Sequence, residues 1–318
     1  MIAAGLLLWA GLVAAVATRV LPRARWVYRS PGLGLCAWYA VLAVLVSAVP
    51  AAVVVALMGW SDTRAAVCGW WAWCVQAAAG GYGSTGRLLA VVLGAALLAV
   101  AARVVRAGWQ TGRTLARRRR RYTAMLAAGR DRPDLGATVV DSPIAAAFVV
   151  PGGPGRVVLT TATLQVLPAA QVAAVLDHER AHAAGHHQLL ADTARLLAAA
   201  FPTATVLARA RQQIDRLVEM RADDVAARRH ARLDLARALV TMAQAGRRVD
   251  AVVAAGAVAA NGADALERVR RLLEPPAALG TPVRLTVGAG LAALAVTPVL
   301  LVVLAGLFPV LSGCPPIR

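Results

Sequence analysis

The stretch His178-Glu-Arg-Ala-His182 has the pattern H-E-x-x-H and lies within an alanine- and leucine-rich segment, residues 172–187. Pro168 suits the first turn of a helix, and no helix breaker follows before Gly185, so the segment predicts a helix. Histidines four residues apart lie one above the other on the same helix face. Two imidazoles in that arrangement can bind one zinc ion, with Glu179 beside them as a general base.

The composition of the chain indicates a membrane protein. Of 318 residues, 59% are hydrophobic, and the mean hydropathy is +0.63, whereas soluble domains are nearer half apolar. The formal net charge is +18, all of its cations are arginine, and the arginines cluster beside apolar runs. The block 117–121 has five arginines in a row, each worth about 1 kcal/mol near an anionic lipid surface. We therefore expect a lipid bilayer as partner, and no direct binding of nucleic acid.

Four apolar runs are candidates for transmembrane helices: residues 2–18, 35–60, 88–105 and 285–311. The first is at the short limit for a membrane span, and a cleaved signal peptide is its alternative. No positive charge precedes this run and its arginines follow it, which favours a retained helix.

Arginine placement predicts the orientation of these helices. The segment 19–33 and the residues after 105 are strongly basic, whereas the loop 61–86 and the tail 312–318 are not. The positive-inside rule then places both termini outside a multi-pass plasma-membrane protein, and residues 106–284 in the cytoplasm. The predicted organisation is a membrane region 1–105, a cytoplasmic domain 106–284, a fourth membrane helix and a short outer tail.

Three cysteines fall on the outer, oxidising side in this topology: Cys68, Cys74 and Cys314. A disulfide among them and free thiols are both compatible with the sequence.

The sequence of the cytoplasmic region predicts an α+β domain. A helix is expected at about 113–129, followed by strands at 137–141, 145–150 and 156–161, with a Pro/Gly turn at 151–155. Residues 196–207 are too short to span a bilayer and suggest a helical hairpin. Helices are expected at 209–232 and 263–273. A strand beside the zinc can pair with an extended substrate or can simply bury the back of the site, and both interpretations stay open.

A catalytic zinc needs a third protein ligand. Glu219 is the preferred candidate, because Asp223 lies one turn beyond it and can accept a hydrogen bond from a zinc histidine. His187 is the alternative, but the longer pattern H-E-x-x-H-x-x-G-x-x-H requires a histidine at 188, which is Gln188 here. A one-residue shift on a turn matters, because metal–ligand distances tolerate only a few tenths of an ångström.

These motifs, with Val157 to Thr161 and Leu266 to Leu273, resemble those of the gluzincin membrane metallopeptidases, and among them the BlaR/MecR-type family most. The HtpX/CAAX-prenyl-endopeptidase group is similar. The resemblance implies three membrane helices, a cytoplasmic zincin-like domain and a fourth helix. It covers most of residues 110–275. Because the chain ends at Arg318, without a penicillin-binding sensor domain, β-lactam sensing by that route is not expected.

The resemblance implies a zinc metalloendopeptidase with one Zn²⁺ per chain. His178, His182 and Glu219 would be its ligands and Glu179 its general base. His230 and Arg216 are candidates for stabilising the transition state. The expected substrates are cytoplasmic or membrane-proximal proteins, such as a transcriptional repressor cleaved in signal transduction. The alternatives are an HtpX-like quality-control protease and a non-catalytic membrane sensor or scaffold that retains the zinc fold.

Overall fold

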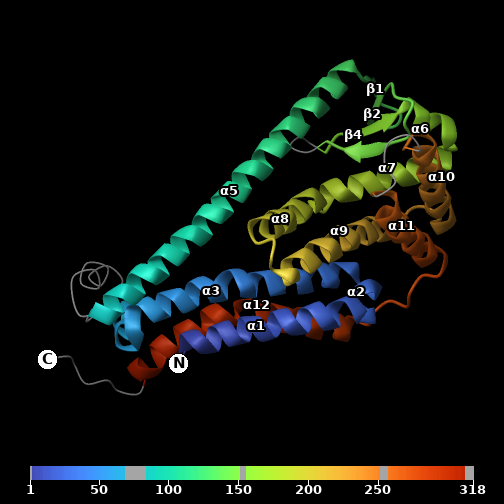
Figure 1. Ribbon diagram of the computed structural model, residues 1–318. Coiled ribbons are helices and arrows are strands. Elements are labelled where there is room, and N and C mark those ends of the chain that lie inside the picture. Colours follow the sequence, from blue (N-terminus) through green and yellow to red (C-terminus); the bar gives the residue numbers. More distant parts are fainter. Residues whose placement is uncertain (1, 69–83, 151–154, 251–256, 312–318) are drawn as a thin grey trace.

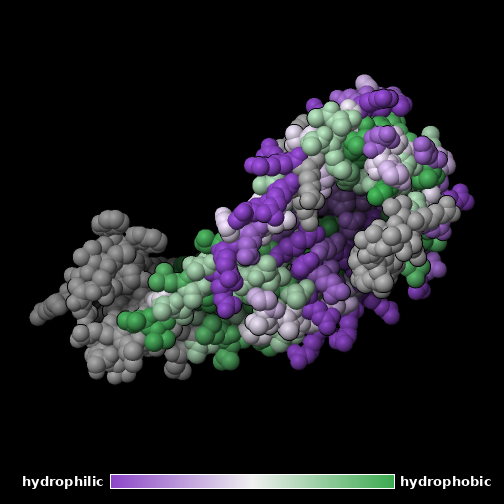
Figure 2. Space-filling model, turned by 45° about the horizontal axis from the view of Figure 1, so that its top comes forward, coloured by the Kyte–Doolittle hydropathy of each residue, from purple (hydrophilic) through white to green (hydrophobic). Residues whose placement is uncertain are grey.

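A computed structural model describes residues 2–68, 84–150, 155–250 and 257–311 of the chain. The protein is mainly helical, with a small four-stranded sheet at one end of the molecule (Figure 1). On the face seen in Figure 2, hydrophobic residues gather next to the grey residues, whereas hydrophilic residues are concentrated toward the other end, with hydrophobic residues among them.

Helices from both ends of the chain form a bundle (Figure 1). Its elements are α1 (Ile2–Val20), the 3₁₀ turn η1 (Leu21–Arg23), α2 (Arg25–Arg29), α3 (Pro31–Cys68) and α12 (Thr281–Leu311). Helix α3 packs against both α1 and α12.

Three stretches of this bundle are long and apolar enough to cross a membrane: Ala4–Arg23, Pro31–Ala52 and Thr281–Leu301. They overlap three of the four predicted runs. Only 6% of the α12 stretch is buried, and an apolar helix so exposed needs a lipid or protein surface to cover it. The apolar helices therefore point to membrane association.

The helix α5 (Ser84–Ala128) differs from the expectation. The sequence predicts an apolar run at 88–105 and a separate helix at 113–129, but one uninterrupted helix contains both. Arginine and alanine are good helix formers, and the two glycines between the runs, Gly108 and Gly112, cost only about 1 kcal/mol each. Part of the run 88–105 lies outside the residues whose side chains are described, so its crossing of a membrane stays a prediction.

The sheet follows α5. Its strands are β1 (Arg130–Arg132), β2 (Ala137–Val140), β3 (Ala147–Val149) and β4 (Val157–Thr160), in the order β1-β2-β4-β3. The pair β2–β4 is parallel and the other two pairs are antiparallel. Strands lie within the three predicted segments, whereas β1 was not predicted, because its three residues are charged and exposed. The strand β3 is at the edge of the sheet.

The remaining helices carry the candidate site. They are α6 (Thr161–Val166), α7 (Ala169–Ala184), α8 (His187–Ala200), α9 (Thr205–Ala226), α10 (Arg232–Asp250) and α11 (Ala257–Leu273). The expected helix over 172–187 ends early, at Ala184. His186 has a left-handed backbone conformation, with φ of 50°, and the next helix, α8, begins after it. The expected hairpin at 196–207 is the connection of α8 to α9.

Helix α9 joins the two halves of the molecule. It packs against α3 of the bundle and against α7 and α8 of the other half. Its residues Ile214, Leu217 and Met220 are fully buried in a core that also contains Trp38 of α3. Burying a large apolar side chain contributes about 1.5–3 kcal/mol, so α9 is held firmly in the position from which it presents Glu219.

Candidate metal centre

Helix α7 presents the two motif histidines toward each other. His178 and His182 are one turn apart, and their Nε2 atoms are 3.1 Å from each other. The helix is fixed by its apolar residues Val172, Val175 and Leu176, which are buried in one core with residues of β4 and α10. The imidazoles are therefore placed by a buried helix rather than by a loop.

Glu219 of α9 completes a triangle with these two nitrogens. Oε2 of Glu219 lies 3.6 Å from Nε2 of His178, and Oε1 lies 3.5 Å from Nε2 of His182. Ligands of a tetrahedral zinc ion with bonds of about 2.0–2.2 Å are separated by roughly 3.3–3.6 Å. The three side chains are thus close enough together for one zinc ion to bind between them with small adjustments, and the donor set of two histidines and one glutamate suits that metal. Within the described residues, these three form the one cluster that could hold a metal ion.

Asp223 supports His178 from the other side of the ring. Oδ1 of Asp223 is 3.0 Å from Nδ1 of His178, although the angle at the ring nitrogen departs from that of a regular hydrogen bond. Such a carboxylate holds a metal-binding histidine in the tautomer that leaves Nε2 free for the metal. The spacing of Glu219 and Asp223 along α9 therefore supplies two different contacts to the same imidazole.

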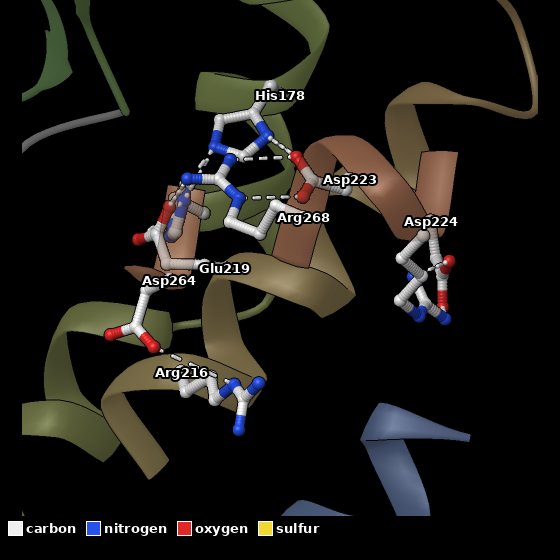
Figure 3. Close-up of polar contacts among 9 residues, drawn as sticks. His178, Arg216, Glu219, Asp223, Asp224, Asp264 and Arg268 are labelled. Atoms are coloured by element: carbon white, nitrogen blue, oxygen red, sulfur yellow. Dashed lines mark hydrogen bonds and ion pairs between the residues drawn. The ribbon is translucent and has the colours of Figure 1, made fainter. Parts of the chain in front are cut away.

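Arg268 of α11 is a site residue that the sequence did not reveal. Its Nε and Nη2 donate hydrogen bonds of 2.8 Å each to the two oxygens of Asp223. Its Nη1 is 2.9 Å from Oε2 of Glu219 (Figure 3). One guanidinium thus orients two carboxylates of the site at once. Its segment, Leu266 to Leu273, is part of the family resemblance, but no pattern within it shows that Arg268 would meet Asp223, 45 residues earlier, and Glu219.

Burial and charge set the protonation states of this group in the metal-free protein. Burial alone lowers the pKa of His178, but the carboxylates of Asp223 and Glu219 outweigh it and raise that pKa to about 9. Burial raises the pKa of Glu219, yet nearby His178 and the Arg268 charge hold it at about 2. Burial acts likewise on Asp223, but Arg268 keeps the pKa of that carboxyl well below its usual range.

His182 has a different environment. Burial lowers its pKa to about 4, so the ring is neutral at physiological pH and can bind a metal without losing a proton. His187 lies behind it, with its Nδ1 3.1 Å from Nδ1 of His182. His187 is buried, and burial also lowers its pKa to about 4. His187 therefore contacts Nδ1 of His182, whereas Nε2 of His182 faces His178 and Glu219.

Glu179 follows His178 on α7 and lies close to the sheet. Burial raises the pKa of its carboxyl to about 7, with the backbone of Val149 on β3 among the groups that act in the other direction. A carboxyl with a pKa near neutrality can both accept and release a proton at physiological pH. This is the property required of a general base.

The two other candidates from the sequence have other partners. Nε2 of His230 is 3.0 Å from Oδ2 of Asp177. Arg216 forms ion pairs with Asp264 and Glu267 (Figure 3) and lies over the ring of Tyr28. The structure therefore brings neither residue to the triangle of His178, His182 and Glu219. The side chain of Cys68, together with Cys74 and Cys314, lies outside the described residues.

Comparison with known proteins supports the same type of site. No curated protein matches the chain, and no solved structure matches it. Residues 113–276, just over half of the chain, match Peptidase family M48. The match includes all four strands, helices α6 to α11 and every residue of the triangle. The chain therefore belongs to peptidase family M48, a family of metallopeptidases.

Proposed function

We propose that this protein is a membrane-anchored zinc metalloendopeptidase whose zinc ligands are His178, His182 and Glu219. The observation that carries the proposal is the cluster of His178, His182 and Glu219, whose ligand atoms all lie within 4.8 Å of one another, in a chain of family M48. When bound there, zinc would polarise the scissile carbonyl and lower the pKa of a water molecule.

The protein's own residues would divide the remaining work. A carboxylate oxygen of Glu179 accepts the proton of the attacking water and later delivers it to the leaving amine. Its pKa of about 7 permits both transfers. Asp223 and Arg268 hold His178 and Glu219 in place through the contacts described above.

The edge strand β3 offers a place for the substrate. Among the described strands, β3 pairs with β4 alone. Val150 donates its N–H to Arg156 of the β4 side and Ala146 accepts from Thr160, so Ala147 and Val149 direct their backbone groups to the free edge. A peptide added to this edge as a strand would pass beside Glu179. This geometry supports the proposal of endopeptidase activity on extended segments of proteins.

The class of substrate follows from the predicted topology. The arginine distribution favours a cytoplasmic location for the peptidase half, where a cytoplasmic repressor or a membrane-proximal protein would be cleaved. The resemblance to BlaR/MecR-type proteins favours regulatory cleavage, and the similarity to the HtpX group favours turnover of membrane proteins. Regulatory cleavage and turnover of membrane proteins would both use the same zinc-dependent peptide hydrolysis.

The test uses the full-length chain in lipid nanodiscs. Wild type, Glu179→Gln and the matched surface variant Glu274→Gln are compared for bound zinc and for cleavage of unfolded casein and a membrane-tethered reporter. Glu274 is exposed and pairs only with Arg270 among the described residues. We expect Glu179→Gln to retain zinc and lose activity about 10²–10⁴-fold, with Glu274→Gln unchanged.

Two results would contradict the proposal. Equal cleavage by wild type and Glu179→Gln would remove Glu179 from the mechanism. Zinc bound by wild type without cleavage of either substrate would favour the non-catalytic sensor or scaffold.

A further inference from the structure

The ends of several helices meet at one end of the bundle, beside the peptidase half. There α1 passes through η1 and α2 into α3, and α12 begins at Thr281 (Figure 1). The C-terminal part of α9, the start of α10 and the end of α11 reach the same place. This junction is the end of the membrane-type helices at which Arg19, Arg23 and Arg25 also lie.

A pocket at this junction is lined by an unusual concentration of arginine. Its volume is about 230 Å³. Asp224 is the single acidic residue in its lining. Six arginines line it, five of them on five different helices and Arg228 in the turn after α9: Arg29, Arg221, Arg228, Arg232, Arg271 and Arg284. The volume is several times the roughly 30 Å³ of one water molecule but below the roughly 300 Å³ of pockets for drug-sized molecules. It therefore suits a small charged group.

The charge of this pocket is largely unbalanced. Arg271 is paired: its Nη1 and Nη2 donate to Asp224 at 2.6 and 2.8 Å, and its Nε donates to the Tyr28 carbonyl at 3.2 Å. Figure 3 shows Asp224 on a different side of α9 from Glu219, away from His178. In the described part of the chain, the other five arginines have no carboxylate within ion-pair distance. Several guanidinium groups in one concave site repel each other unless an anion lies between them.

Two helix N-termini add to the positive potential. The pocket includes Ser30 and Pro31, where α3 begins, and Leu279, just before α12. The first N–H groups of a helix lack partners within the helix and carry a partial positive charge, so helix N-termini favour anions. The guanidinium of Arg221 also lies against the first turn of α3, near Gly32.

We propose that this arginine pocket binds a phosphate group, and that its source is the headgroup of an anionic phospholipid. Guanidinium groups bind phosphate oxygens in pairs of parallel hydrogen bonds, and several arginines can share one phosphate. The pocket is bounded by the first residues of α3 and α12, both of which begin apolar stretches long enough to cross a membrane. A lipid whose acyl chains lie along these helices would have its headgroup at this level. The proposal concerns binding and does not depend on peptidase activity.

The experiment measures thermal unfolding of the full-length protein in detergent micelles at constant ionic strength. Phosphatidylglycerol, phosphatidylcholine and inorganic phosphate are titrated separately. The pocket variant carries Arg228→Gln and Arg284→Gln, which change two exposed residues. The control variant carries Arg156→Gln and Arg237→Gln, which remove the same charge from exposed positions outside the pocket.

Phosphatidylglycerol should raise the unfolding midpoint of wild type and of the control variant, and phosphatidylcholine should not. The pocket variant should need about 30-fold more phosphatidylglycerol for the same effect. Protection of wild type by millimolar inorganic phosphate, lost in the pocket variant, would support the phosphate site and assign it to a soluble phosphate ester. An identical response of the pocket and control variants to phosphatidylglycerol would overturn the proposal.

Discussion

Asp223 accepts two hydrogen bonds of 2.8 Å from Arg268, while its Oδ1 lies 3.0 Å from Nδ1 of His178. The carboxylate therefore joins an arginine of α11 to a candidate zinc ligand of α7, although it belongs to α9. Both Asp223 and Arg268 are enclosed by the protein, with 2% and 13% of their side chains exposed. The position of α11 therefore helps to set the geometry of the metal ligands.

The first prediction concerns Arg268→Gln, which leaves Asp223 buried without its charged partner. We expect zinc affinity to fall about 10–100-fold, as for loss of other groups that orient metal ligands. We also expect the free energy of unfolding to fall by about 3–5 kcal/mol, because one partner of a buried ion pair is removed. Zinc competition with a chelator and denaturant unfolding measure these two effects. Arg270→Gln, at an exposed position of the same helix, is the control, and equal zinc affinity in the two variants would exclude the role assigned to Arg268.

The second prediction concerns Gly185, between α7 and α8. A Cβ at this position would collide with the ring of His187, whereas the backbone conformation itself is open to any residue. We expect Gly185→Ala to displace His187 from His182 and to lower the midpoint of thermal unfolding. Adding His187→Ala to Gly185→Ala should restore part of that midpoint, because it removes the collision. Gly112→Ala is the control, since open space surrounds that glycine. A midpoint as high in Gly185→Ala as in the control would show that the contact is unimportant.

The third prediction is the pH dependence of zinc binding. His178 has a pKa of about 9 in the metal-free protein and His182 a pKa of about 4. At neutral pH, zinc must therefore displace one proton, from His178. We expect zinc affinity to fall about tenfold per pH unit as the pH decreases from 9 toward 5. Chelator competition across this range measures the slope. Asp223→Asn should flatten it near neutral pH, because the Asp223 carboxylate raises the pKa of His178. A slope of two protons in wild type would contradict the assignment.

The fourth prediction concerns the stability of the metal-free protein. The pKa of His178 is raised by folding from 6.5 to about 9. A raised histidine pKa contributes stability that is fully present below the unfolded-state pKa and is lost as the pH rises through the folded-state pKa. Chelator-treated protein should therefore lose stability between about pH 6.5 and 9. Denaturant unfolding at several pH values tests this, with His178→Gln as the variant in which this part of the pH dependence should vanish.

The fifth prediction tests the edge strand β3. Ala147→Pro removes an N–H that points to the free edge and leaves the hydrogen bonds to β4 in place. We expect kcat/KM for casein to fall at least tenfold if substrate adds to this edge, because the loss of a backbone hydrogen bond leaves a polar group of the substrate unpaired. Zinc content and the unfolding midpoint should stay near those of wild type. Unchanged kcat/KM in a folded, zinc-loaded variant would mean that β3 serves only to bury the back of the site.

Local patterns in the sequence were enough to predict much of this protein. Helical periodicity places His178 and His182 on one face of their helix. It likewise places Glu219 and Asp223 on one face of a second helix, because residues four apart on a helix are neighbours whatever surrounds it. Apolar runs predict membrane-type helices, and three of the four overlap stretches that are long and apolar enough in the structure. Short apolar and partly β-branched segments predict three of the four strands.

Other features depend on how distant segments pack, and these only the tertiary structure decided. Arg268 enters the metal centre from α11, and His187 lies behind His182 because His186 is left-handed. Arginines from five helices and one turn line a single pocket. Each of these contacts joins residues whose spacing in the chain carries no helical or strand periodicity. Charge and hydropathy identify which side chains need a partner, but only the packing of α9 between the bundle and the peptidase half determines which partner they meet.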